Sequence, residues 1–114
     1  MKEILVIDND SYICKLLEKY LIEKKFKTDI SYSGKKALQK IKNKKYDLVL
    51  CEYRLPDTDG LKLLKQIKEI NPLIPFIIIT TSDNVRMAVT LIKAGAFDYL
   101  IKPIHREELL DLIR

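Results

Sequence analysis

Short strand-like segments alternate five times with segments of helical periodicity, and this alternation constrains the fold more than any other feature of the chain. Residues 4–7, for example, are four consecutive apolar residues that are followed at once by Asp8. A continuous apolar run that ends in turn-forming residues predicts a strand buried on both faces. The predicted strands cover residues 2–7, 28–32, 47–51, 76–79 and 98–101.

Between the predicted strands, apolar residues recur every three or four positions, which predicts helices with one inward face. Asp10 or Ser11 is expected to cap the first helix, and Gly95 is expected at the end of the fourth. The predicted helices lie within residues 11–25, 33–41, 61–70, 85–95 and 106–114. Five strands alternating with five helices predict an α/β fold in which a parallel sheet is covered on both faces.

Composition agrees with a single globular domain of 114 residues, because 47% of the residues are hydrophobic and 32% are charged. No apolar run approaches the roughly 20 residues that cross a bilayer, and the first residues do not resemble a secretory signal, so we expect a cytoplasmic protein. The net charge of +5 comes from lysines on polar helix faces, which predicts a solvated surface without direct nucleic-acid or membrane contact. Cys14 and Cys51 lack metal-site spacing and are expected to be reduced and buried.

Polar residues follow four of the predicted strands, and in open parallel sheets ligands bind at the carboxyl ends of strands. A polar residue at one strand end is most often a helix cap, but convergence of several indicates a site for a small anion, with or without a divalent cation. The candidate residues are Asp8, Asn9, Glu52, Thr80 and Lys102.

Four stretches of the chain carry a resemblance to a known family: Ile4–Asp10, Tyr46–Gly60, Pro75–Thr81 and Gly95–Pro103. Over nearly its whole length the chain resembles the receiver domain of two-component response regulators. The resemblance implies a flavodoxin-like, doubly wound sheet of order 2-1-3-4-5 and one receiver domain over residues 1–114. The C-terminal part is most similar to receivers that precede ATPase-type transcriptional activators, and the last helix stops in mid-pattern. We therefore expect that the helix is cut short and that an output domain lies outside this sequence.

In the family, an aspartate after the third strand accepts a phosphoryl group from a sensor histidine kinase. The resemblance places Glu52 at this phosphoacceptor position. It places Asp8 and Asn9 where the family has an acidic pair that holds Mg²⁺. Glu52 and the backbone carbonyl of Arg54 would complete the protein ligands of the metal.

Further roles follow from the same resemblance. Lys102 corresponds to the lysine that pairs with the phosphoryl oxygens, and Thr80 to the hydroxyl residue that hydrogen-bonds them. Thr80 and Tyr99 match the family's switch residues, whose movement remodels the surface of the fourth helix, fifth strand and fifth helix. That surface is also where a homodimer would form. The pair Lys102–Pro103 resembles the family's cis peptide, and X–Pro bonds tolerate the cis form best.

Two positions depart from the family pattern, because Glu52 replaces the acceptor aspartate and Asn9 replaces an acid. The formal charge of Asp8, Glu52 and Lys102 sums to −1, where the family's three carboxylates and one ammonium sum to −2. Magnesium prefers anionic oxygen ligands, so we expect weak or absent binding. The Glu52 carboxylate also lies roughly 1.5 Å further along its side chain than an aspartate carboxylate would.

We therefore predict an atypical receiver that is not an enzyme and that acts as a protein–protein switch or dimerisation module with impaired phosphotransfer. An ordinary phosphorylatable receiver that uses Mg²⁺ is the main alternative. A flavodoxin-like nucleotide or flavin binder is the other, but Asp8, Asn9 and Asp10 stand where such a protein needs a phosphate-binding loop.

Overall fold

In a computed structural model, which describes residues 2–81 and 83–113, the centre of the molecule is a parallel sheet. Its strand order is β2-β1-β3-β4-β5, as the family resemblance implies. Each described strand is four or five residues long. Because the strands are parallel, the polar residues that follow them lie at the same edge of the sheet. The strands are β1 (Glu3–Ile7), β2 (Lys27–Ser31), β3 (Leu48–Glu52), β4 (Phe76–Thr80) and β5 (Asp98–Ile101).

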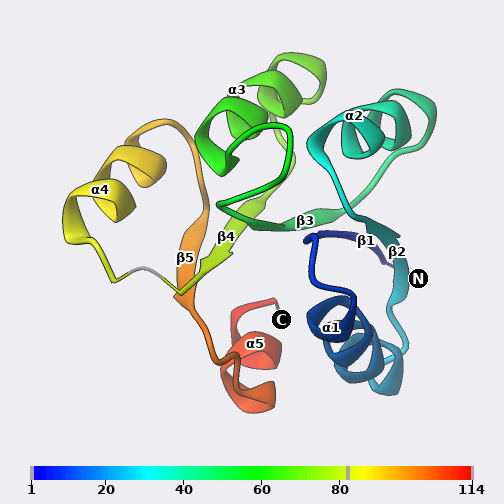
Figure 1. The fold of residues 1–114 in the computed structure, drawn as a ribbon. Helices are drawn as coiled ribbons and strands as arrows, with labels where there is room; N and C mark the ends of the chain where they lie inside the picture. Colours follow the sequence, from blue (N-terminus) through cyan, green and yellow to red (C-terminus); the bar gives the residue numbers. More distant parts are fainter. Residues whose placement is uncertain (1, 82, 114) are drawn as a thin grey trace.

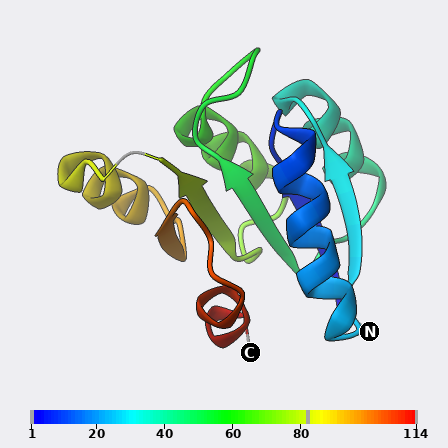
Figure 2. The ribbon, with the colours of Figure 1, turned by 60° about the horizontal axis from the view of Figure 1, so that its bottom comes forward.

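Helices cover both faces of the sheet (Figure 1). Three of them, α2, α3 and α4, lie on one face, while α1 and α5 lie on the other; Figure 2 brings this second face forward. The helices are α1 (Ser11–Glu23), α2 (Gly34–Asn43), α3 (Gly60–Ile70), α4 (Val85–Lys93) and α5 (Arg106–Leu112). None of the described helices is long and apolar enough to cross a membrane.

The hydrophobic core consists of two layers, one on each face of the sheet, because successive strand residues point to opposite faces. In β1, Leu5 and Ile7 pack into the layer beneath α2, α3 and α4. Ile4 and Val6 of the same strand pack into the layer beneath α1 and α5. All four side chains are fully or almost fully buried, which explains why β1 reads as a continuous apolar run rather than as an alternating one.

Side-chain caps begin four of the described helices. The carboxylate of Asp10 accepts hydrogen bonds from the first turn of α1, and Ser33, Asp59 and Asn84 do the same for α2, α3 and α4. Gly95 follows α4 with a φ of +113°, a backbone conformation that glycine adopts without steric strain. The predicted helix boundaries at Asp10 and Gly95 are therefore confirmed.

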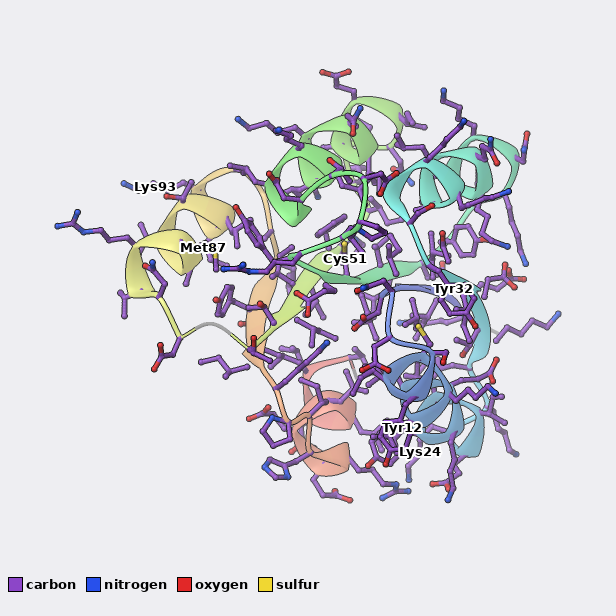
Figure 3. The ribbon with its side chains drawn as sticks, in the orientation of Figure 1. Tyr12, Lys24, Tyr32, Cys51, Met87 and Lys93 are labelled. Carbon is purple, nitrogen blue, oxygen red and sulfur yellow. The ribbon has the colours of Figure 1, made fainter. Side chains whose placement is uncertain are left out.

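The apolar residues that mark α4 in the sequence are largely exposed, although an apolar stripe of helical spacing commonly faces the core. Val85 is 74% exposed, and Val89 and Ile92 are also exposed, whereas Leu91 is fully buried. In Figure 3, Met87 also points from α4 toward the sheet. Because α4 covers the edge of the sheet at β5, only a narrow strip of the helix finds core to pack against.

Smaller differences concern strand ends. The second strand begins at Lys27 and ends at Ser31, so Tyr32 lies outside it and is 48% exposed. Glu52 and Thr80 are the last residues of β3 and β4, whereas the sequence pattern placed them just after these strands. The ladder hydrogen bonds therefore extend to the residues whose side chains form the candidate site.

Both cysteines are fully buried and free, as predicted. Figure 3 shows Cys51 in the interior, beneath the helices of one face. Burial and the nearby Asp8 carboxylate raise the pKa of Cys14 to about 12, and burial beside Glu52 raises the pKa of Cys51 well above its ordinary value. Both thiols therefore stay protonated and behave as small apolar side chains.

Candidate functional site

The carboxyl ends of four neighbouring strands bring the candidate residues together. Asp8 directly follows β1, Glu52 ends β3, Thr80 ends β4 and Lys102 directly follows β5. The parallel register pairs Ile7 with Cys51, Glu52 with Ile79 and Thr80 with Ile101, so these ends lie at one edge of the sheet. The sequence-based prediction that these residues share one site is consistent with this register.

Lys102 is the centre of the site, because its ammonium group bridges two carboxylates. Its Nζ atom lies 2.8 Å from Oδ2 of Asp8 and 2.9 Å from Oε1 of Glu52. The side chains are only 12%, 4% and 9% exposed for Lys102, Asp8 and Glu52 respectively. Such short, shielded contacts between opposite charges are stronger than the same pairs on an open surface.

The remaining carboxylate oxygens accept hydrogen bonds from the backbone. The N–H of Asp10 donates to Oδ1 of Asp8 over 2.9 Å, and the N–H of Arg54 donates to Oε2 of Glu52 over 3.0 Å. Each of the four carboxylate oxygens therefore has one protein donor. The pair Asp8 and Glu52 is satisfied by Lys102 and by two backbone N–H groups.

The protonation of Lys102 reflects two opposed effects. Burial by itself would lower the pKa of the ammonium group, but the hydrogen bonds and charges of Asp8 and Glu52 outweigh it and raise the pKa above the ordinary lysine value. Lys102 is therefore a permanent cation at neutral pH. Beneath it, the Cys14 thiol donates a weak hydrogen bond of 3.3 Å to the backbone carbonyl of Asp8, which anchors this strand end to α1.

The described side chains of this site offer few carboxylates to a divalent cation. In the described part of the chain, no group of three or more His, Cys, Asp and Glu side chains is placed to hold a metal. Among the described residues, Asp8 and Glu52 are the two buried carboxylates, and Lys102 and two backbone N–H groups already donate hydrogen bonds to their oxygens. Asn9, the third predicted ligand, lies exposed on the loop after β1.

Thr80 lies beside the bridging lysine on the neighbouring strand, and Tyr99 and the predicted cis peptide lie close to it in the sequence. Thr80 is 1% exposed at the end of β4, and its backbone carbonyl accepts the Lys102 N–H over 2.8 Å. The Lys102–Pro103 peptide is cis. Tyr99 is partly buried on β5, where it lines a shallow hollow together with exposed side chains of α4 such as Val89.

The loop between β3 and α3 contains Asp57, whose contact with a distant helix has no local signal in the sequence. Asp57 lies in a turn-rich stretch, and turn formation is the default interpretation of such an aspartate. In the structure its carboxylate reaches the backbone of Gly34 and Lys35 at the start of α2. No local sequence pattern predicts this contact, because it joins positions more than twenty residues apart.

The model of the response regulator receiver domain family matches residues 4–114. The chain belongs to this family. The receiver domain is 41% identical, over 111 residues, to the transcriptional regulatory protein ZraR of Salmonella typhimurium. It is 38% identical, over 108 residues, to the DNA-binding transcriptional regulator NtrC of Klebsiella pneumoniae. These matches cover 97% and 95% of this chain but only 25% and 23% of the relatives, so the receiver domain spans about a quarter of their length.

Solved structures agree with this family and with the fold. A two-component response regulator from Clostridium difficile superposes with a TM-score of 0.96 at 34% identity, covering 99% of this chain and 93% of that one. A CheY-like receiver domain protein from Methanospirillum hungatei superposes with a TM-score of 0.94 at 29% identity, covering 99% and 90%. The flavodoxin-like fold predicted from the sequence is therefore confirmed.

The chain is thus a response regulator receiver domain of a two-component system. Domains of this family interact with histidine kinases and other signalling proteins, typically bind Mg²⁺ and are generally not catalytic. The roles of individual residues in this receiver domain depend on how Glu52 and Asn9 change the site.

Proposed function

We propose that this receiver domain works as a protein–protein switch whose phosphotransfer is impaired. The observation that carries the proposal is the position of the Glu52 carboxylate, which is bonded to Lys102 at one oxygen and to the Arg54 N–H at the other. Lys102 is the residue that would pair with the phosphoryl oxygens in the family. The Glu52 carboxylate thus already fills part of the space that a phosphoryl group would take. With its single negative charge it also pairs with Lys102, the cation that would bind that group.

Geometry and charge both support impaired phosphotransfer. The longer Glu52 side chain shifts the attacking oxygen outward, and a misplacement on the order of 1 Å lowers the rate of an aligned reaction about 100-fold. The carboxylates of Asp8 and Glu52 together carry −2, and Lys102 neutralises half of it, which leaves little attraction for Mg²⁺. Asn9 adds no charge. The family resemblance assigns the switch roles to Thr80 and Tyr99, and in this proposal these residues change conformation without a phosphate.

Labelling with acetyl phosphate and Mg²⁺ tests this proposal without knowledge of the kinase. We expect the Glu52→Asp variant to incorporate a phosphoryl group, because it relieves the misalignment, and the unmodified domain to react on the order of 100-fold more slowly or not at all. Glu52→Gln is the matched control that lacks a nucleophilic carboxylate. Intact-protein mass spectrometry over time measures the incorporation.

Stoichiometric labelling of the unmodified domain would overturn the proposal in favour of an ordinary receiver that tolerates Glu52. Strong NMR shifts of Thr80 and Lys102, when Mg²⁺ and beryllofluoride are added to the unmodified domain, would contradict it as well. The ordinary receiver is equally consistent with the family match and with relatives at about 40% identity that are transcriptional regulators, and the labelling experiment separates the two functions.

The docking part of the proposal rests on the exposed apolar side chains of α4 and β5. Val85, Val89, Ile92 and Ile101 are 74%, 46%, 45% and 44% exposed, and with Tyr99 they line one shallow hollow. We call these five residues the α4–β5 surface. A contiguous patch of exposed apolar side chains commonly marks a site of protein–protein contact. We propose that a second copy of the domain covers the α4–β5 surface.

Sedimentation analysis at increasing concentration tests this interface. We expect a reversible dimer, and we expect Val89→Asp to raise its dissociation constant by at least about tenfold, because it would bury an unpaired charge. Leu73→Asp is the matched control, since Leu73 is 90% exposed and lies in the α3–β4 loop. A monomer at all concentrations, or equal weakening by both substitutions, would contradict the dimer.

A further inference from the structure

The loop between β3 and α3 is attached to a helix that is distant in sequence. Oδ1 of Asp57 accepts the N–H of Gly34 over 2.9 Å, and Oδ2 accepts the N–H of Lys35 over 2.8 Å. These are the first two N–H groups of α2, which have no partner within their own helix. Both carboxylate oxygens are used, so Asp57 holds the helix start in a two-point contact.

A second contact brings the same two segments together. A Cβ atom built on Gly34 would collide with Cγ2 of Thr58, the residue that follows Asp57. The absence of a side chain at Gly34 therefore lets the loop approach the backbone of α2 directly. The helix start and the tip of the loop are packed against each other as well as hydrogen-bonded.

The loop itself is a closed hairpin that leads back to the site. The N–H of Leu55 donates to the carbonyl of Thr58 over 3.2 Å, and the N–H of Gly60 donates to the carbonyl of Tyr53 over 2.6 Å. Arg54 and Asp59 form an antiparallel bridge between these bonds. A displacement of the loop tip is therefore transmitted to Arg54, whose N–H donates to the Glu52 carboxylate.

We propose that Asp57 is a positioning residue for the Glu52 site. By fastening the tip of the β3–α3 loop to the start of α2, it holds the Arg54 N–H on the Glu52 carboxylate. The positioning role of Asp57 rests on the proposed function in one respect: it takes Glu52 as the residue through which the switch acts. It also gives the site a mechanical connection to α2, on the same face of the sheet as α4 but separated from it by α3 (Figure 1).

Electrostatics support the strength of this attachment. The two backbone N–H groups hold the pKa of the Asp57 carboxyl below its ordinary value. A carboxylate at a helix N-terminus also interacts favourably with the helix dipole. Asp57 is exposed, however, so water competes for its oxygens, and the packing of Thr58 on Gly34 is needed to keep the contact closed.

Amide hydrogen exchange of Arg54, followed by NMR, tests the positioning role directly. We expect Asp57→Ala to increase the exchange rate of the Arg54 N–H on the order of tenfold, because the loop opens more often once two charge-assisted hydrogen bonds are lost. Ser33→Ala is the matched control. Ser33 caps the same helix by accepting the Lys36 N–H over 3.2 Å, but among the described residues its side chain makes no hydrogen bond to the loop hairpin that leads to Glu52.

The control separates a positioning role from simple helix capping. Both substitutions should speed exchange in the first turn of α2, and only Asp57→Ala should speed exchange at Arg54. Equal effects of the two variants at Arg54, or no effect of Asp57→Ala there, would overturn the positioning role. This readout is independent of phosphotransfer, so it can fail while the proposed function stands.

A second measurement joins the two proposals. In the Glu52→Asp variant, Asp57→Ala should slow labelling by acetyl phosphate, and Ser33→Ala should not. Compared with Asp57→Ala, Asp57→Glu should recover part of the labelling rate, because it restores a carboxylate on a side chain that is one methylene longer. If Glu52→Asp is not labelled at all, the length of the Glu52 side chain is overturned as the cause of the impaired phosphotransfer, and the Arg54 exchange data still decide the role of Asp57.

Discussion

Replacing Lys102 with methionine is expected to lower the free energy of unfolding by about 3 kcal/mol, because removing one partner leaves buried charges without compensation. Lys102 is the partner of both Asp8 and Glu52, and all three side chains are shielded from solvent. Methionine keeps much of the side-chain volume, so the effect reports on charge rather than on a cavity. Urea denaturation followed by circular dichroism measures the change.

Two comparisons make this result specific. Lys93→Met removes a lysine that points into solvent on α4 (Figure 3) and should change stability by no more than about 0.5 kcal/mol. Adding Glu52→Gln to Lys102→Met should restore about 1 kcal/mol or more, since a neutral amide replaces one of the stranded carboxylates. Equal effects of Lys102→Met and Lys93→Met would contradict the bridging role of Lys102.

The stabilisation by Lys102 has a defined pH dependence. Because the pKa of Lys102 is raised in the fold, its contribution is fully present below the unfolded lysine pKa of about 10.4 and is lost as the pH rises through the folded value. The unmodified domain should therefore lose stability above this pH, and the Lys102→Met variant should lose less over the same range.

Replacing Phe76 with alanine is expected to lower the free energy of unfolding by about 4 kcal/mol. Phe76 begins β4 and is fully buried in the apolar layer beneath α2, α3 and α4. Its removal leaves a cavity in the layer between the sheet and these helices, where the packed neighbouring side chains cannot move far enough to fill it. Equilibrium denaturation measures the loss of stability. The slope of the unfolding free energy against denaturant concentration, the m value, should stay unchanged.

Phe97→Ala is the control of the same residue type, because Phe97 is 59% exposed in the turn that precedes β5. It should lower stability by less than about 1 kcal/mol. If Phe76→Ala abolishes folding, Phe76→Leu should still fold with a loss of about 1 to 2 kcal/mol. Similar losses for Phe76→Ala and Phe97→Ala would contradict the placement of the core.

The order of elements could be predicted from the sequence because each strand and helix carries a local signal. The apolar run at residues 4–7 predicts a strand buried on both faces, and Asp10 and Gly95 mark helix ends by their backbone preferences. The grouping of Asp8 with Glu52 followed from parallel strands, whose carboxyl ends share one edge. In each case, a local preference and the general geometry of α/β sheets were sufficient.

The exposure of α4 could not be predicted in this way. Val85, Val89 and Ile92 recur with helical spacing, as core residues do, yet they face outward while Leu91 is buried. Periodicity shows that a helix has an apolar stripe, but it does not show whether another element covers that stripe. Only the position of α4 at the edge of the sheet decides this.

By itself, the sequence determined the alternation of strands and helices, the family, and the departure of Glu52 and Asn9 from its pattern. These properties depend on residue type and near neighbours along the chain. The tertiary structure alone decided that Lys102 bridges Asp8 and Glu52, and that Asp57 fastens the neighbouring loop to α2. Such contacts join residues between about 20 and 94 positions apart, and the direction of each side chain there is set by the packing of the whole sheet.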